Sequence, residues 1–200
     1  MAGLDNMAMG SLDAAAWIAK KNRDGRIQLA RFGDELQVVG TDSYVLVSSL
    51  IPCQFDSWPD GASVTFINDG GAADKIETLV KSLRKYMIRK VALTIEIDDF
   101  NDYELQMMGT NAAGFSNKLC IVLRTTSRIN LEKFENMLDC QPEGHVAMSD
   151  ETLESIGTLV KKARCYCASW IFNDRDPLHA FDIRRHDGKA YIIAMPVRAE

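Results

Sequence analysis

Three clusters of lysine and arginine in this sequence have the residue types and the spacing needed to contact phosphate groups. Each cluster falls at the C-terminal end of a stretch with helical periodicity. The clusters are Lys20, Lys21 and Arg23; Lys81, Arg84, Lys85 and Arg89; and Lys161, Lys162 and Arg164. Cations placed in this way can neutralise a phosphate backbone without reading bases. Cations at helix C-termini also complement the helix dipole, so one such cluster alone would carry little weight.

The overall charge of the chain does not by itself favour a nucleic-acid partner. The 200 residues include 28 acidic and 23 basic side chains, which gives a formal net charge of −5. Net charge is a poor guide, however, when the cations are gathered on one surface. Clusters at the same place in a repeated unit predict one shared basic surface, because equivalent units pack in equivalent ways.

The middle of the chain shows the repeated unit most clearly. A short strand is predicted at 63–67, a helix over 72–89, and strands at 91–97, 103–107 and 119–123. The apolar residues of the helix recur at the spacing of one buried stripe. They are Ile76, Leu79, Val80, Leu83 and Met87. The order of elements is therefore β-α-β-β-β.

The C-terminal end of the chain repeats this order. A short strand is predicted at 145–148, and Ser149 is a good N-cap for the following helix. Three strands then follow, at 167–172, 179–183 and 190–195, and Asp187 with Gly188 forms a hairpin turn before the last. The predicted buried stripe of this helix is Leu153, Ile156, Leu159, Val160 and Ala163.

The N-terminal stretch supplies a third copy of the unit. A short strand is predicted at 7–9, a helix from Ser11 to residue 19, and strands at 27–31, 35–39 and 44–50. The fold class is therefore α+β, with three β-α-β-β-β modules whose helices lie on one face of antiparallel sheets.

The three modules divide unevenly into domains. Residues 1–126 are predicted to form one complete domain of two modules, and residues 145–200 a half-domain of one module. Residues 127–144, which end near Pro142 and Gly144, are predicted to be a connector. This connector is too short to hold the three further strands of a fourth module.

The sequence offers no convergent set of residues for catalysis, so we expect no enzyme, no cofactor and no metal. The three histidines fall at predicted strand edges or turns, and no glycine-rich phosphate loop is present. Five cysteines are an odd number and do not form a disulfide framework. No apolar run approaches the length of a membrane helix, and the N-terminal residues lack the charged and apolar regions typical of a secretory signal. We therefore expect a cytoplasmic protein without a membrane partner.

Two short segments resemble the bacterial DNA sliding clamp, the beta subunit of DNA polymerase III. The segment GDELQVVGTD, from Gly33 to Asp42, resembles the N-terminal hairpin of that family. The C-terminal segment YIIAMPVR, from Tyr191 to Arg198, resembles its last strand and tail. Asp176-Pro-Leu178 also fits the last module of the family. The order of modules agrees over most of the chain.

This resemblance implies a DNA-clamp fold and a non-enzymatic processivity factor. In such clamps basic helices line a ring around duplex DNA, and a pocket beside the tail captures peptides of DNA polymerase and clamp-loader proteins. The matching pocket residues here are Ile193, Met195, Pro196, Val197 and Arg198. A bacterial clamp subunit has six modules, so a ring of twelve would take four copies of a three-module chain, which implies a homo-oligomer.

Two alternatives to a processivity factor remain open. One is a clamp-derived, peptide-binding regulator that does not encircle DNA. The other is an enzyme built on a clamp-like scaffold, which a buried cluster of histidines or carboxylates in a concave pocket would favour.

Overall fold

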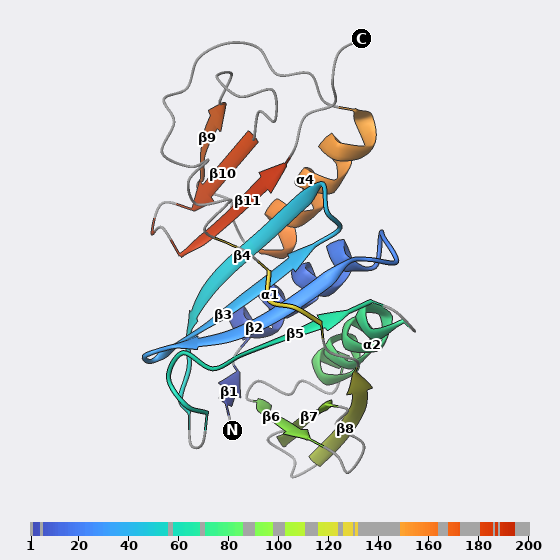
Figure 1. Ribbon diagram of the computed structural model, residues 1–200, viewed down its shortest axis with the longest axis vertical. Coiled ribbons are helices and arrows are strands. Elements are labelled where there is room, and N and C mark those ends of the chain that lie inside the picture. Colours follow the sequence, from blue (N-terminus) through green and yellow to red (C-terminus); the bar gives the residue numbers. More distant parts are fainter. Residues whose placement is uncertain are drawn as a thin grey trace.

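Two antiparallel sheets and a layer of helices make up the described part of the chain in the computed structural model (Figure 1). The structure describes residues 2–4, 6–55, 58–68, 71–85, 91–97, 103–110, 116–123, 126–129, 131, 149–163, 168–172, 181–185, 187 and 189–194. Among these residues no helix is long and apolar enough to cross a membrane.

The larger sheet contains strands from all three modules. Its order is β5 (Ser63–Ile67), β2 (Arg26–Phe32), β3 (Glu35–Thr41), β4 (Val45–Pro52), β11 (Ala190–Ala194), β10 (Phe181–Arg185) and β9 (Ala168–Phe172). The smaller sheet has the order β1 (Ala2–Leu4), β6 (Val91–Ile97), β7 (Tyr103–Thr110) and β8 (Ser116–Leu123).

The first two modules exchange their first strands. Strand β1 of the first module pairs with β6 of the second, with Leu4 opposite Val91. Strand β5 of the second module pairs with β2 of the first, with Arg26 opposite Ile67. Each of these two modules therefore adds an edge strand to the sheet of the other.

The third module joins the first through its last strand. Strand β11 pairs antiparallel with β4, and Ile192 lies opposite Val47. The hairpin predicted around Asp187 lies between β10 and β11 and brings them together. One continuous sheet therefore runs from the first module into the third.

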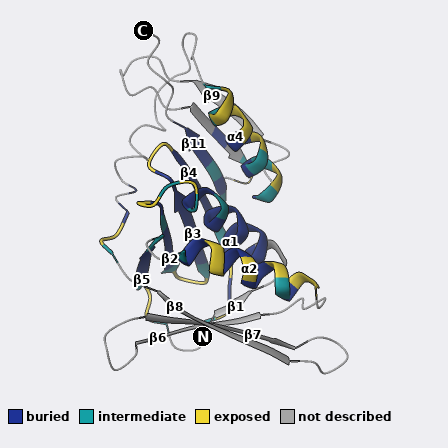
Figure 2. Ribbon diagram, turned by 90° about the vertical axis from the view of Figure 1, so that its right-hand side faces the viewer, coloured by how far each residue is buried: buried dark blue, intermediate teal, exposed yellow. Residues whose placement is uncertain are grey.

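Helices α1 (Asn6–Ala19) and α4 (Asp150–Lys162) lie on one face of the larger sheet, and α2 (Ala72–Lys85) packs beside α1 and against β8 of the smaller sheet (Figure 2). Alternate residues of the strands point to this face, as the pleat requires. Ile27, Leu29 and Val38 pack there with residues of α1 and α2. Val47, Ile183 and Ile192 pack with residues of α1 and α4. Helix α1 is shared by both clusters and lies between the other two helices.

Most of the predicted elements are confirmed. The strands after each helix are present with boundary shifts of a few residues, and the Ser149 hydroxyl accepts a hydrogen bond from the backbone N–H of Thr152, which caps α4. Ile156, Leu159 and Ala163 of the predicted stripe are buried. The first strand of the third module and the end of the helix beyond Lys85 lie outside the described residues.

Two details of the prediction are wrong. Residues 7–9 belong to helix α1, which begins at Asn6, and the first strand is the earlier β1. Methionine and alanine are good helix formers, and their burial against the sheet and the other helices lets the helix start before Ser11. Leu153 was predicted to be buried but is 49% exposed, because no other described helix covers that side of α4.

The opposite face of the larger sheet carries a smaller apolar cluster. Val39, Leu46 and Ile193 lie on β3, β4 and β11 and pack with Ile129 and Leu131 of the segment after β8. This segment starts at the edge of the sheet, where the Thr126 N–H donates to the Thr65 carbonyl. It then reaches the sheet face, where the Ile129 N–H donates to the buried side chain of Gln28, at 2.8 Å.

Candidate nucleic-acid interface

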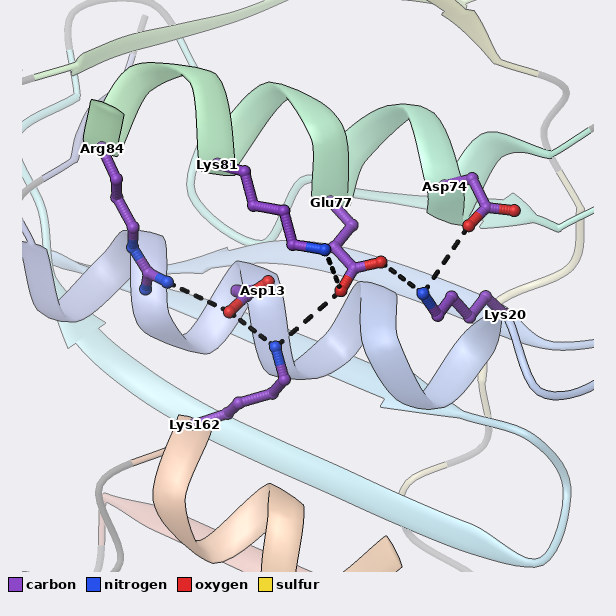
Figure 3. Close-up of polar contacts among 7 residues, drawn as sticks. All are labelled: Asp13, Lys20, Asp74, Glu77, Lys81, Arg84 and Lys162. Atoms are coloured by element: carbon purple, nitrogen blue, oxygen red, sulfur yellow. Dashed lines mark hydrogen bonds and ion pairs between the residues drawn. The ribbon is translucent and has the colours of Figure 1, made fainter. Parts of the chain in front are cut away.

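The predicted basic residues lie on the helical side of the larger sheet, but they differ in their surroundings. Lys20, Lys81, Arg84 and Lys162 converge on two buried carboxylates, which belong to Asp13 and Glu77 (Figure 3). Arg23, Lys85 and Lys161 are exposed. Arg89 and Arg164 lie outside the described residues.

Lys21 takes a third kind of position. It is exposed, and its ammonium donates to the Ser155 hydroxyl of α4 at 2.9 Å. The same ammonium lies 4.8 Å from the centre of the Trp17 ring, a cation–π distance. Lys21 therefore connects the end of α1 with α4.

Asp13 on α1 binds cations from both neighbouring helices. Its Oδ2 atom lies 3.1 Å from Arg84 Nη1 of α2 and 2.8 Å from Lys162 Nζ of α4. The Asp13 side chain is only 4% exposed, whereas that of Arg84 is 41% exposed. The carboxylate is therefore part of the helix junction, and the guanidinium lies between it and the solvent.

Glu77 on α2 also binds cations from neighbouring elements. It pairs with Lys20, which follows α1, and its Oε1 atom lies 2.9 Å from Lys81 Nζ and 3.9 Å from Lys162 Nζ. Lys20 also approaches Asp74, at 3.7 Å. All three helices are therefore joined by one chain of ion pairs.

The surroundings of Glu77 and Lys20 shift the pKa of each group toward the charged form. Burial raises the pKa of the Glu77 carboxyl, but hydrogen bonds from Lys20 and Lys81, together with their charges, outweigh it and hold the pKa below its ordinary value. The hydrogen bond to Glu77 raises the pKa of Lys20, and burial opposes this only in part. Both partners stay ionised near neutral pH.

Asp13 and Glu77 occupy the same position in their two modules. When the buried stripes are aligned so that Leu12 matches Ile76, Asp13 matches Glu77 and Lys20 matches Arg84. The acid of each helix binds the base that comes seven residues after the acid of the other helix. The two ion pairs are therefore reciprocal across the contact between α1 and α2.

Reasoning from the sequence missed both carboxylates. The signal was present, because one cation of each cluster follows an acid by seven residues: Lys20 follows Asp13, and Arg84 follows Glu77. An acid at that spacing on one helix is normally solvated. Its role becomes visible only when a second helix is known to pack against the first.

Of the predicted peptide-binding residues, the structure describes Ile193 alone. Ile193 is 2% exposed and belongs to the cluster that Ile129 and Leu131 cover. This cluster lies on the sheet face opposite the helices. Met195, Pro196, Val197 and Arg198 lie outside the described residues.

Comparisons with known proteins find similarity in structure only. No family model and no curated protein matches the sequence. DNA polymerase III subunit beta from Pseudomonas aeruginosa superposes on 100% of this chain, with a TM-score of 0.58 and 10% identity. The beta subunit from Thermotoga maritima superposes on 99% of it, with a TM-score of 0.59 and 10% identity. A chain of the PCNA2-PCNA3 complex from Sulfolobus tokodaii superposes on 100%, with a TM-score of 0.55 and 12% identity.

These superpositions show that the chain has the DNA sliding-clamp fold. The predicted fold class, antiparallel sheets with the helices on one face, is confirmed. The chain spans 66% and 64% of the length of the two bacterial subunits, and 100% of the Sulfolobus chain.

Proposed function

We propose that this chain is a sliding-clamp-like processivity factor of DNA replication. It binds duplex DNA without regard to sequence through its helical face, and it tethers DNA polymerase or other replication proteins through the opposite face. The observation that carries this proposal is the packing of three helices with basic ends into one layer, with α1 between α2 and α4, in the fold of the sliding clamps.

The DNA contact is assigned to the cations that point away from the helix junction. Lys85 is exposed and makes no ion pair within the described ranges, and Lys81 is 62% exposed although it also pairs with Glu77. Lysine side chains at helix ends contact phosphates as mobile point charges and carry no base specificity. The expected complex is therefore sensitive to salt and indifferent to sequence.

The tethering contact is assigned to the opposite face of the sheet. Ile193 packs there beside Val39 and Leu46, and the segment through Ile129 and Leu131 lies over them. Residues 195–198, which the resemblance implicates in peptide binding, follow β11 directly. Separate faces would let one molecule hold DNA and a replication protein at the same time.

The assembly we propose is a homo-oligomer, built from one complete domain and one half-domain per chain. Residues 1–126 would form the complete domain, since their two modules exchange strands. Residues 127–144 would be the connector, and residues 145–200 the half-domain that another subunit completes.

The proposal is tested by DNA binding with charge reversal on each face. Fluorescence anisotropy on unrelated duplexes should give equal affinities, and binding should weaken as salt rises. Lys85→Glu should weaken binding to every duplex and reduce the salt slope by about 1. Arg128→Glu is the matched control, because Arg128 is exposed on the segment that crosses the opposite face. Equal losses in both variants, or no wild-type binding at low salt, would contradict the proposal.

The second candidate is a peptide-binding regulator that does not encircle DNA. The resemblance of residues 195–198 to the clamp tail supports it, because that segment does not belong to the basic helices. The two functions separate in a polymerase pull-down and a processivity assay with Lys85→Glu. If the protein is a processivity factor, Lys85→Glu should abolish its support of primer extension on long templates and leave its binding to the polymerase unchanged. If it is a regulator, the variant should change neither measurement.

A further inference from the structure

Much of the basic charge on the helical face is matched by acids within the same face. Four predicted DNA-binding cations, Lys20, Lys81, Arg84 and Lys162, meet three carboxylates, Asp13, Asp74 and Glu77 (Figure 3). Four positive and three negative charges leave a formal charge of +1. The cluster therefore attracts phosphate much less than its lysines and arginine suggest.

The depth of the carboxylates decides how firmly the cations are held. The side chains of Asp13 and Glu77 are 4% and 6% exposed, so their charges act in a medium less polarisable than water. Lys162 and Lys20 are themselves only 20% and 31% exposed and lean toward these acids. A phosphate must compete with a buried carboxylate for each of these ammonium groups.

We propose that Asp13 and Glu77 limit the affinity of this protein for DNA. They hold Lys20, Arg84 and Lys162 at the helix junction, so only the outer cations, such as Lys85, make full phosphate contacts. Few contacts mean that little must be broken when the protein moves by one phosphate, which favours movement along DNA over fixed binding. This inference rests on the proposed function and adds two positioning residues to it.

The acid occurs at the same position in the first two modules, which supports a common role in holding cations. Asp13 and Glu77 match when the first two helices are aligned, and each binds a cation from the other helix. Both cations that pair across this contact, Lys20 and Arg84, come from the predicted DNA-binding clusters. The acids therefore act on the residues that would otherwise reach the phosphates.

The test is the salt dependence of DNA binding by the double variant Asp13→Asn, Glu77→Gln. Both changes keep the shape of the side chain and remove its charge, and the released cations are partly exposed and can turn to solvent. We expect tighter binding and a plot of log Kd against log salt that is steeper by about 2 to 3, at about 0.9 for each cation released.

The matched control is the double variant Glu151→Gln, Glu154→Gln. It removes the same two charges from exposed positions on α4, and neither acid makes an ion pair within the described residues. Its salt slope should equal that of the wild type. If the buried double variant does not fold, Glu77→Gln alone releases Lys20 while Asp13 still holds Arg84 and Lys162, so the slope should steepen by about 0.9.

The outcomes separate this inference from the proposed function. Wild-type protein that does not bind DNA at low salt contradicts the proposed function. Wild-type protein that binds, together with a folded Glu77→Gln variant of unchanged slope, overturns the inference alone. An equal steepening in the control pair also overturns it, because the effect would then come from net charge and not from release of held cations.

Discussion

Helices α2 and α4 belong to equivalent modules, yet they face different surroundings. Residues 80 positions apart correspond, so Ile76 matches Ile156 and Leu79 matches Leu159, and all four are buried against the larger sheet or the neighbouring helix. The next face of each helix differs. Ala73 is fully buried, whereas its counterpart Leu153 is 49% exposed.

The charged positions show the same difference. Glu77 is buried and binds two lysines, whereas its counterpart Gly157 is exposed, and no atom lies within 4 Å of where its Cβ would be. The sheet-facing stripe thus depends on the module alone, while the helix-facing side depends on a neighbour. Helices α1 and α2 cover each other, and α4 contacts α1 through Ile156 and Leu159, but no described helix lies over Leu153 and Gly157.

Substitution of Gly40 probes a close contact between β3 and α1 inside the first module and should have the largest effect. A Cβ at residue 40 of β3 would lie 2.3 Å from the Cα of Ala15, so α1 could not keep its place. Gly40→Ala should lower the free energy of unfolding by about 4 kcal/mol, beyond the usual cost of overpacking. Urea unfolding measures it, and a loss below about 1 kcal/mol would show that α1 moves easily.

Truncation of corresponding apolar side chains should separate the two helices next. Ile76→Ala removes a fully buried side chain and should cost about 3 kcal/mol, while Leu153→Ala should cost less than about 0.5 kcal/mol. Both losses of free energy can be calculated from the urea midpoints of unfolding when the m value is the same for wild type and variant. Equal costs would mean that Leu153 is covered in solution, which would remove the contrast between α2 and α4.

The sequence was sufficient to predict most of the described helices and strands because their signals are local. Apolar residues recur at helical spacing in α2. At the start of α4, the Ser149 hydroxyl accepts a hydrogen bond from Thr152, only three residues further along the chain. The pairing of β11 with β4 and the ion pair of Arg84 with Asp13 could not be predicted in this way. Their partners lie far apart in the chain, and only tertiary packing brings them together.

The N-terminal helix shows how packing changes a local prediction. Ser11 and Asp13 are typical of a helix start, but both are buried inside α1, which begins at Asn6. The turn of helix before them is stabilised by burial of Met9 between sheet and helices. A capping pattern therefore identifies a helix start only where solvent reaches it.

Neutralisation of Glu77 should have an intermediate effect that depends on pH. The pKa of the Glu77 carboxyl is held below its ordinary 4.5, so the ion pairs stabilise the fold fully above pH 4.5 and less as the pH falls through the lowered pKa. Lys20, whose pKa is raised above 10.5, adds stability that is present below pH 10.5 and is lost as the pH rises through the raised pKa.

Glu77→Gln should therefore cost about 1–2 kcal/mol at neutral pH, because the partly exposed lysines can turn to water. Urea unfolding from pH 7 to pH 3 should give a flatter profile for the variant than for the wild type. Parallel profiles would show that other carboxyls, such as Asp187 beside Arg185, cause the acid sensitivity.

Filling the corresponding position of α4 should give the smallest effect, with the opposite sign. Gly157 lies inside the helix, and a Cβ there meets no atom within 4 Å. Alanine removes backbone freedom from the unfolded chain at no steric cost, so Gly157→Ala should raise the free energy of unfolding by about 0.5–1 kcal/mol. The same glycine-to-alanine change is thus predicted to damage β3 and to strengthen α4. A Gly157→Ala variant that is destabilised would show that another surface packs against α4 in solution, because only a close neighbour can make a methyl group costly there.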